Sequence, residues 1–190
     1  MPRSSLQFKA MKEERQLQIL EAALPLFALY GVKNVSVDAI ATKAKCSHGL
    51  IYHYYKNSQE VFDTLLKSEN YKLVSENLLK NRKEMTDYDA FKDIISTIWD
   101  FLYKDNDILS FLLIVINEED PKSIFATLKN LIRRCQNQGL INGGEPEQLT
   151  EAFLNEVRGI IYPRLLDKKY NKPIPDLEIA NELFRKRVRV

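Results

Sequence analysis

The fold is decided by residues 34–57, which read NVSVDAIATKAKCSHGLIYHYYKN. Two serines in this stretch, Ser36 and Ser47, each stand directly before a short run in which apolar residues have helical spacing. A serine hydroxyl accepts a hydrogen bond from a free N–H at the start of a helix, so both are expected N-caps. The stretch therefore predicts two short helices, over residues 37–44 and 48–55, joined by a three-residue turn.

The second of these helices has an inward and an outward face. Ile51 and Tyr55 are four residues apart, so they share one face and are expected to pack inward against Ile40 and Cys46. Two helices of this size bury little surface on their own, and the unit is typical of a helix-turn-helix, whose second helix enters the major groove of DNA. The outward residues of the second helix are His48, Gly49, Leu50, Tyr52 and His53.

Helical spacing continues on both sides of this unit. A helix is expected over residues 11–30, with a kink at Pro25, because a proline ring presses on the carbonyl of the preceding turn. Asn57 followed by Glu60 has the pattern of a capping box and predicts a long helix to about residue 83. The apolar face of the first helix consists of Ile19, Ala22, Ala23, Leu26, Phe27 and Tyr30.

The rest of the chain also has the helical period. The sequence holds only 6 glycines in 190 residues and few alternating β-branched runs, which leaves little room for strands. Prolines at positions 121, 146 and 175 suit the first turn of a helix, where a missing N–H leaves nothing unpaired. Further helices are expected over residues 89–103, 107–117, 121–138, 146–167 and 175–188. We therefore expect an all-α fold of about nine helices.

Residues 34–57 resemble the DNA-binding domain of the TetR family of repressors. The match continues backwards through Ile19-Leu20-Glu21-Ala22-Ala23, Leu26-Phe27 and Gly31 with the spacing kept, and it covers most of residues 15–66. The resemblance implies a helix-turn-helix DNA-binding domain over residues 1–57 and a helical effector-binding and dimerisation domain over residues 58–190. It also implies a sequence-specific, homodimeric transcriptional regulator: a repressor released from its double-stranded DNA operator by a small-molecule effector.

The family places its base contacts near the start of the second short helix. By that correspondence, the residues that read bases are His48, Gly49, Leu50 and His53. An imidazole can donate or accept toward a base edge, glycine allows close approach of the backbone, and leucine suits a thymine methyl. The operator sequence is not readable from these residues, and an activator remains an alternative to a repressor.

The other candidate contacts, as the family pattern implies, are with the phosphate backbone. They are Ser36, Val37, Lys45, Ser47, Tyr52, Tyr54 and Lys56. The alternative is that the tyrosines belong to the core and the lysines are ordinary surface charges. Lys45 stands where the family usually has glycine, at a cost of about 1 kcal/mol if its φ is positive. Ser58 stands where the family usually has lysine, so a helical adaptor that has lost DNA binding also stays open.

Residues 67–190 resemble the family more weakly. Residues 135–147 are similar to the turn before the family's dimerisation helix, which implies an interface with a second copy from residues 149–166 and 177–188. The first of these segments presents more apolar surface than one flanking helix can cover, and Gly159 allows close helix approach. The expected interface residues are Leu149, Phe153, Val157, Ile160, Ile161, Leu177, Leu183 and Phe184. The alternative is an internal core.

The family builds its ligand cavity on the central helices. This implies an effector pocket lined by Trp99, Leu102, Tyr103, Phe111, Phe125 and Leu128, for a partly apolar small molecule. A ligand that favours the DNA-incompetent arrangement would lower operator affinity. An aromatic stripe at helical spacing is also typical of plain core, and that alternative stays open.

Charge and cysteine content argue against other classes of protein. The net charge is +2, and residues 1–60 hold 8 Lys and Arg against 5 Asp and Glu, which suits phosphate contacts. Cys46 and Cys135 are 89 positions apart and form no disulfide or zinc-binding pattern, which suits a reducing cytosol. Neither a signal peptide nor a membrane span is visible, so we expect a cytoplasmic protein. No catalytic motif accompanies the two histidines, which have no acid nearby, so neither an enzyme nor a cofactor is expected. A metal site of Cys46, His48 and His53 is disfavoured because Cys46 should be buried.

Overall fold

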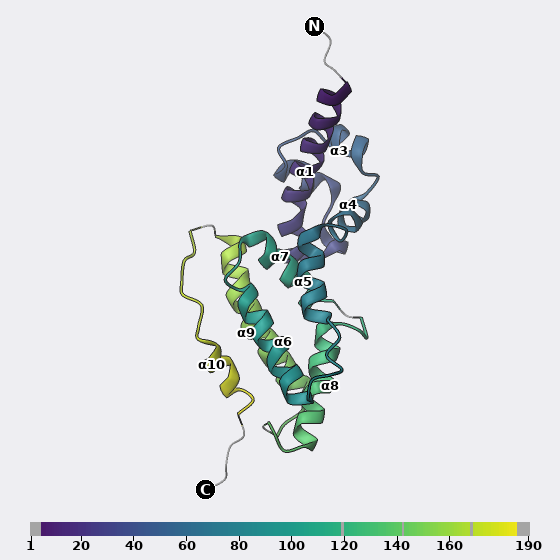
Figure 1. Cartoon of the computed structure of the whole chain (residues 1–190). Coiled ribbons are helices and arrows are strands. Elements are labelled where there is room, and N and C mark those ends of the chain that lie inside the picture. The colour runs from purple at the N-terminus through teal and green to yellow at the C-terminus, as the bar shows by residue number, and fades with distance from the viewer. Residues whose placement is uncertain (1–4, 119, 142, 168, 186–190) are drawn as a thin grey trace. The chain divides into compact units, whose positions relative to one another are not determined.

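The structure is a computed structural model that describes residues 5–118, 120–141, 143–167 and 169–185. Within these ranges it contains ten α-helices and one short 3-10 helix, without a strand (Figure 1). The predicted all-α fold is therefore confirmed. The number of helices exceeds the expected nine by one because the helix expected to reach about residue 83 is interrupted.

The chain divides into two compact units between Lys72 and Leu73. Helix α4 packs against α1, so it belongs to the first unit, which continues beyond residue 57, the expected end of the first domain. The first unit contains α1 (Ser5–Tyr30), η1 (Val32–Asn34), α2 (Val37–Lys43), α3 (His48–Tyr54) and α4 (Ser58–Leu65).

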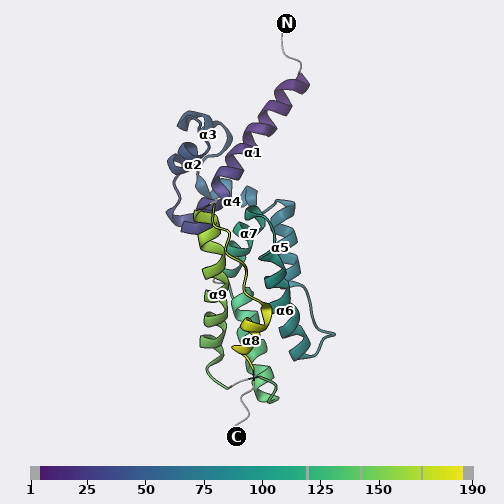
Figure 2. The same cartoon turned by 90° about the vertical axis from the view of Figure 1, so that its left-hand side faces the viewer.

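Helix α1 is the longest element of the first unit. It begins at Ser5, before the expected start at residue 11, and it continues through Pro25 as one helix. Helices α2 and α3 lie together beside it (Figure 2). The rings of Phe27 and Phe62 meet edge to face with their centroids 5.3 Å apart, which ties α1 to α4. The fully buried core side chains of this unit include Ile19, Ala23, Ile40, Ile51 and Val61.

The second unit is built around α7. Every residue of α7 from Ile108 to Ile116 is buried, as expected for a helix that is apolar on all sides. Helix α8 packs against both α6 and α9, and α7 packs against α9. The division falls within α5 (Glu69–Leu79), most of which belongs to the second unit. The other helices of this unit are α6 (Asp87–Phe101), α7 (Asn106–Ile116), α8 (Ile124–Asn137), α9 (Pro146–Leu166) and α10 (Leu177–Glu182).

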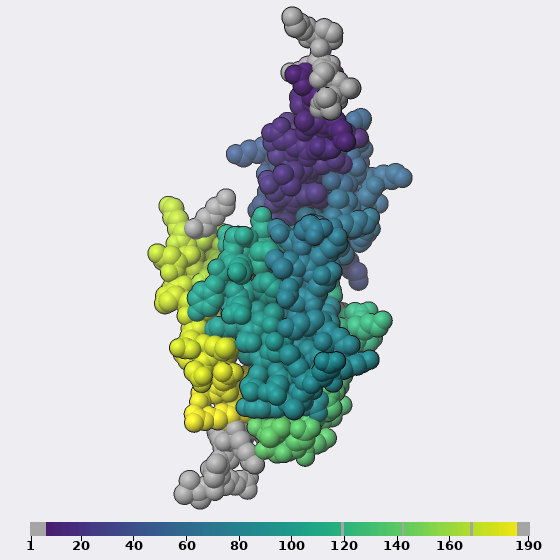
Figure 3. Space-filling view, viewed as in Figure 1, coloured from purple at the N-terminus to yellow at the C-terminus, as the bar shows by residue number. Residues whose placement is uncertain are grey.

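The C-terminal segment lies on the surface of the second unit. The yellow chain that carries α10 runs along the teal helices in the space-filling view (Figure 3). Phe184, just after α10, contacts the ring of Phe91 on α6 at 4.9 Å and that of Phe153 on α9 at 5.8 Å. Helix α10 is shorter than the expected 175–188, and residues 186–190 lie outside the described part of the chain.

The interruption between α4 and α5 has a local cause. Ser68 can cap a new helix, and its Oγ accepts a hydrogen bond from the N–H of Tyr71 at 3.3 Å. The backbone N–H of Ser68 bonds to the carbonyl of Leu65, one residue closer than in an α-helix, which closes the last turn of α4. At the other end of α5, Arg82 donates to the carbonyls of Leu78 and Asn77 and so satisfies a helix C-terminus.

Proline has the predicted first-turn place in only one of three helices. Pro146 begins α9, whereas Pro121 and Pro175 precede α8 and α10. The caps of those two helices are Ser123 and Asp176, whose side chains accept from backbone N–H groups of the first turn. Among the helices that the structure describes, none is both long enough and apolar enough to span a membrane.

Candidate nucleic-acid interface

Helices α2 and α3 each begin at a serine N-cap. Ser36 Oγ accepts from the N–H of Ala39 at 3.1 Å, and Ser47 Oγ accepts from the N–H of Leu50 at 3.3 Å. Both serines are the predicted N-caps, and both predictions are confirmed. Because each hydroxyl oxygen is the acceptor in its cap, its own hydrogen remains available to donate.

The turn contains the one residue other than glycine that has a positive φ in the described part of the chain. Lys45 has a φ of 53°, in the left-handed region, which costs a residue with a Cβ roughly 1–2 kcal/mol. The turn is closed by the N–H of Lys45 on Thr42 and that of Cys46 on Ala41, at 3.2 and 3.0 Å. The departure from glycine at this position therefore carries the backbone strain expected from the sequence.

Helix α3 has one buried and one exposed face. Ile51 is fully buried and Tyr55 is 4% exposed, which confirms the two residues expected to hold α3 inward. His48, Gly49, Tyr52 and His53 are exposed, and Leu50 and Tyr54 are half-buried. An added Cβ at Gly49 would meet no atom within 4 Å, so this glycine leaves the helix backbone open to an approaching molecule.

Three further candidates have different surroundings. The side chain of Val37 is buried in the core, so only its backbone N–H, at the start of α2, stays a candidate for a DNA contact. Cys46 is half-buried, and not buried as expected. Lys56 is exposed, and its backbone N–H donates to Glu60 Oε2 at 2.7 Å. The N–H of Glu60 in turn donates to Asn57 Oδ1 at 2.9 Å, as the predicted capping box requires.

An ion-pair contact between Asp38 and His48 links α2 to α3. Asp38 Oδ1 in the first turn of α2 lies 2.8 Å from Nδ1 of His48, the first residue of α3, and the two side chains are 62% and 60% exposed. The expectation that neither histidine has an acid nearby is wrong for His48. The sequence alone conceals the pair because the two residues are ten positions apart and meet only through the angle of the turn.

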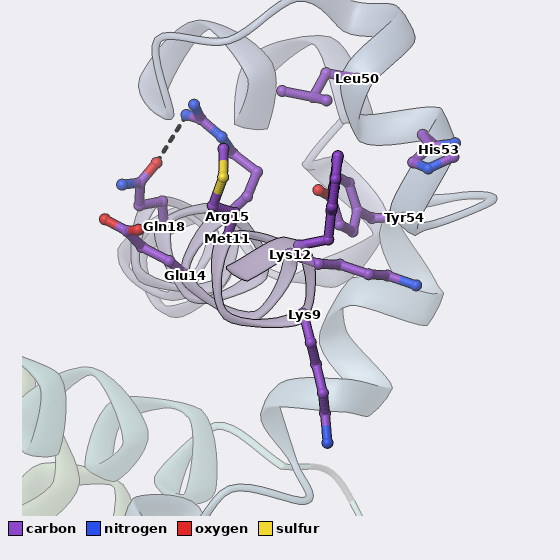
Figure 4. A pocket seen from close by; sticks show the side chains of 10 residues that line it. Lys9, Met11, Lys12, Glu14, Arg15, Gln18, Leu50, His53 and Tyr54 are labelled. Atoms are coloured by element: carbon purple, nitrogen blue, oxygen red, sulfur yellow. Dashed lines mark hydrogen bonds between the residues drawn. The ribbon is translucent and has the colours of Figure 1, made fainter. Parts of the chain in front are cut away.

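Sequence reasoning also missed a basic pocket beside α3. A pocket of about 640 Å³ lies between the N-terminal half of α1 and helix α3 (Figure 4). Lys9, Lys12 and Arg15 of α1 line it together with Leu50, His53 and Tyr54 of α3. The excess of basic residues in the first third of the sequence was a signal for it. The expected helix began at residue 11 and so left out Lys9, and the approach of Lys12 and Arg15 to α3 depends on the tertiary fold.

In the part of the chain that the structure describes, the predicted effector-pocket residues do not line one cavity together. Trp99, Leu102, Phe111 and Leu128 are buried in the core of the second unit, and the Trp99 Nε1–H donates to the carbonyl of Pro175 at 3.1 Å. Tyr103 is 66% exposed, so it points away from that core. Phe125 lines a separate open pocket of about 630 Å³ between the end of α7, the start of α8 and α9. The stripe is therefore core for the most part, because its side chains pack on α7 and its neighbours.

The predicted interface residues also separate into two groups. Phe153, Val157, Ile161 and Phe184 are buried within the single chain, so their assignment to an interface is corrected. Helices α7 and α8 pack on α9, and Phe184 lies between the rings of Phe91 on α6 and Phe153 on α9. The others keep part of their surface exposed: Leu149, Ile160, Leu177 and Leu183. Gly159 is exposed on α9, and an added Cβ there would meet no atom within 4 Å.

This geometry is that of a helix-turn-helix protein. Helix α3 packs on α2, which packs on α1, and α1 also packs on α4. Residues 19–65 match the sequence profile of a family described as bacterial regulatory proteins, tetR family. Over these residues the chain is similar to the tetR family of bacterial regulatory proteins.

Individual relatives agree with this assignment. The uncharacterized HTH-type transcriptional regulator YhgD of Bacillus subtilis (strain 168) is 39% identical over 77 residues, which are 40% of this chain and 36% of YhgD. In four relatives that match this region, the aligned part is 30 to 46% of the relative's own length. The uncharacterized HTH-type regulator YvkB of the same organism is 26% identical over 78% of this chain and 82% of its own length.

Solved structures extend the likeness to the whole fold. The crystal structure of HlyIIR, a hemolysin II transcriptional regulator, aligns with a TM-score of 0.59 at 15% identity, over 92% of this chain and 99% of that chain. At this level of identity the likeness concerns the fold alone. It includes the all-helical second unit, which the family profile does not reach.

Proposed function

We propose that the protein is a sequence-specific DNA-binding transcriptional regulator with α3 as its recognition helix. The observation that carries the proposal is the exposed face of α3, held on the buried Ile51 and Tyr55 within a unit similar to the tetR family. A helix so mounted can enter a major groove without losing its own support. The base-reading residues of this proposal are His48, Gly49, Leu50 and His53.

Phosphate contacts surround that face. Tyr52, Tyr54 and Lys56 lie at the end of α3, and Lys45 lies in the turn before it. The hydroxyl groups of Ser36 and Ser47 and the free N–H groups at the starts of α2 and α3 are suitable partners for phosphate oxygens. Lys9, Lys12 and Arg15 of the α1 pocket add three cations beside α3. Such contacts release counterions, so affinity should fall steeply as salt rises.

The regulator acts as a homodimer in this proposal. Two recognition helices about 34–36 Å apart read successive major grooves on one face of DNA, which a single copy cannot do. The interface would use the exposed parts of Leu149, Ile160, Leu177 and Leu183. Sedimentation equilibrium should give a dimer at micromolar concentration, and a monomer there would remove this part of the proposal.

Release by a small molecule is the third part. One relative, SCO4008 of Streptomyces coelicolor, is named a transcriptional repressor, which supports the repressor form of the proposal. The second unit would bind a partly apolar effector and favour the arrangement that does not fit the operator. A compound that lowers operator affinity should, by linkage, bind less well to the protein on DNA.

The test is selection of bound duplexes from genome fragments by the purified full-length protein. Wild type should enrich a site with two-fold symmetry and half-sites about one helical turn apart. Lys56→Ala should weaken binding to all sequences alike, whereas Lys172→Ala, which removes an exposed lysine of the second unit, should not. Failure of wild type to bind any duplex at about 50 mM salt would overturn the proposal.

A further inference from the structure

Asp38 of α2 and His48 of α3 form an ion-pair contact between the two helices of the helix-turn-helix. The 2.8 Å between Asp38 Oδ1 and His48 Nδ1 is a hydrogen-bond distance. Both residues lie in first turns whose N-caps, Ser36 and Ser47, are formed. The backbone positions of the pair are therefore fixed by the helix starts themselves, and the ring of His48 is oriented before any ligand arrives.

The bond determines which nitrogen of the neutral ring carries the proton. A carboxylate can only accept a hydrogen bond, so the proton lies on Nδ1, which donates to Asp38. The other nitrogen, Nε2, then has a free lone pair and no hydrogen. Because the His48 side chain is 60% exposed, this acceptor is available to a partner.

The charge of the pair restricts which partner is favourable. With a neutral ring the pair carries one negative charge, so a phosphate oxygen, which is an anionic acceptor, is repelled. In the major groove, adenine N6 and cytosine N4 carry amino groups that donate, whereas guanine presents the acceptors N7 and O6. An acceptor beside a carboxylate therefore fits adenine or cytosine and disfavours guanine.

We propose that Asp38 is a positioning residue for specificity: it holds His48 with Nε2 as an acceptor, so that His48 selects an adenine or cytosine amino group at one base of each half-site. The reading of a base rests on the proposed DNA-binding function. The orientation of the ring by Asp38 does not, and it is tested separately on the free protein.

The first experiment measures the tautomer. Nitrogen-15 spectra of full-length protein labelled at histidine, recorded at pH 8.5, should show His48 protonated at Nδ1, with the signals assigned by loss in His48→Ala. Asp38→Ala should move His48 toward the Nε2-protonated form, while His53 in the same spectrum stays unchanged. Asp63→Ala, which removes an exposed carboxylate on α4, should leave both rings as they are. A wild-type ring protonated at Nε2 would overturn the orientation and with it the whole inference.

The second experiment measures base preference. Selection from a random duplex library should give wild type a preference for adenine or cytosine at one position that His48→Ala removes. Asp38→Ala should reduce the preference at that same position by about fivefold or more and leave the other positions unchanged. Asp38→Asn keeps the side-chain shape but can donate as well as accept, so it should give a mixture of tautomers and an intermediate preference. Asp63→Ala should select like wild type.

The outcomes separate this inference from the proposed function. If wild type binds DNA and Asp38→Ala selects the same bases, or changes a position that His48→Ala does not, the positioning role is wrong while the regulator stands. Guanine at the position read by His48 would show that Nε2 donates, which also overturns the inference. If wild type binds no duplex, the proposed function fails together with the base-reading part.

Discussion

Tyr55 contains a polar atom that the fold leaves unsatisfied. Its side chain is 4% exposed, and its buried hydroxyl has no hydrogen-bond partner among the residues that the structure describes. Burial raises the pKa of Tyr55, and the Glu60 carboxylate raises it further. The buried ring of Tyr55 stabilises the packing of α3. Its hydroxyl lowers the stability of the fold, because a buried polar group without a hydrogen-bond partner costs free energy of folding.

Removal of this oxygen should stabilise the protein. Tyr55→Phe keeps the ring and deletes the hydroxyl, so the free energy of unfolding in urea should rise by about 1 kcal/mol. Tyr52→Phe, at an exposed position on the same helix, should change it little. A loss of stability in Tyr55→Phe would show that the hydroxyl has a partner after all.

The same residue predicts a dependence on alkaline pH. The folded pKa of Tyr55 is raised, so the folded state holds the proton more tightly than the unfolded chain, in which tyrosine titrates at about 10. The contribution of Tyr55 is therefore complete below about pH 10 and is lost as the pH rises through the higher folded value. The stability of wild type should fall relative to Tyr55→Phe above about pH 10 in parallel urea titrations, and a constant difference would contradict this.

The strain at Lys45 gives a second test on a single residue. Lys45→Gly should raise the free energy of unfolding by about 1 kcal/mol, because glycine adopts a positive φ without a Cβ clash. Lys45→Ala removes the same charge but keeps the clash, so it should not stabilise. Both variants should lose DNA affinity equally across sequences, and a loss confined to one base pair would instead make Lys45 a base contact.

At this scale the sequence was informative wherever the cause is local. Ser36, Ser47 and the pattern of Asn57 with Glu60 could be read directly, because a cap needs only a side chain and the N–H groups of the next turn. The bond between Asp38 and His48 could not, because it depends on how two helices meet in space.

At the scale of elements, α1 extends the candidate interface beyond the helix-turn-helix. Lys9 and Lys12 lie in its N-terminal turns and line the pocket beside α3 (Figure 4). Their ammonium groups are exposed, so they contribute little to folding. Their role is therefore expected in DNA affinity and not in stability.

Salt dependence can isolate that role. The double variant of Lys9→Ala and Lys12→Ala should bind all duplexes more weakly, and the slope of log affinity against log salt should fall by about 2, one for each lost phosphate contact. Base preference should be unchanged. Lys122→Ala in the second unit is the matched control, and an unchanged slope in the double variant would remove α1 from the interface.

Helix ends were the least predictable elements. The apolar period runs on from α4 into α5, so pattern alone joined them into one helix. The interruption lies at Ser68. Its hydroxyl accepts from the N–H of Tyr71 near the start of α5, and its own backbone N–H closes the last turn of α4 on the carbonyl of Leu65. Such a serine is visible in the sequence, but its effect depends on whether packing favours the bend.

At the scale of the whole molecule, the sequence did not show which apolar side chains are buried in the core of the chain and which stay exposed. A stripe on a helix is equally apolar whether it faces the core of its own protomer or a second copy. In α9, Phe153 and Val157 face the core, whereas Gly159 and part of Ile160 stay at the surface. Which side chains of one helix are buried and which stay exposed is a tertiary property.

Two substitutions on α9 should separate those faces. Gly159→Leu meets open space in the protomer and favours the helix, so the fold should be kept, but a partner helix packed there would be displaced. Sedimentation equilibrium should then show weaker dimers. Phe153→Ala should instead cost the protomer about 3–5 kcal/mol. Unchanged dimerisation of Gly159→Leu would move the interface to another face.

The bond between Trp99 and Pro175 has a practical consequence. Trp99 is the single tryptophan of the sequence, it is buried in the second unit, and its indole N–H is held by the backbone of the C-terminal segment. Its fluorescence emission therefore comes from the second unit alone and is sensitive to the release of that segment into water. A titration with candidate compounds or with duplex DNA therefore needs no added dye. A red shift of the Trp99 emission would show that binding has exposed Trp99 to water.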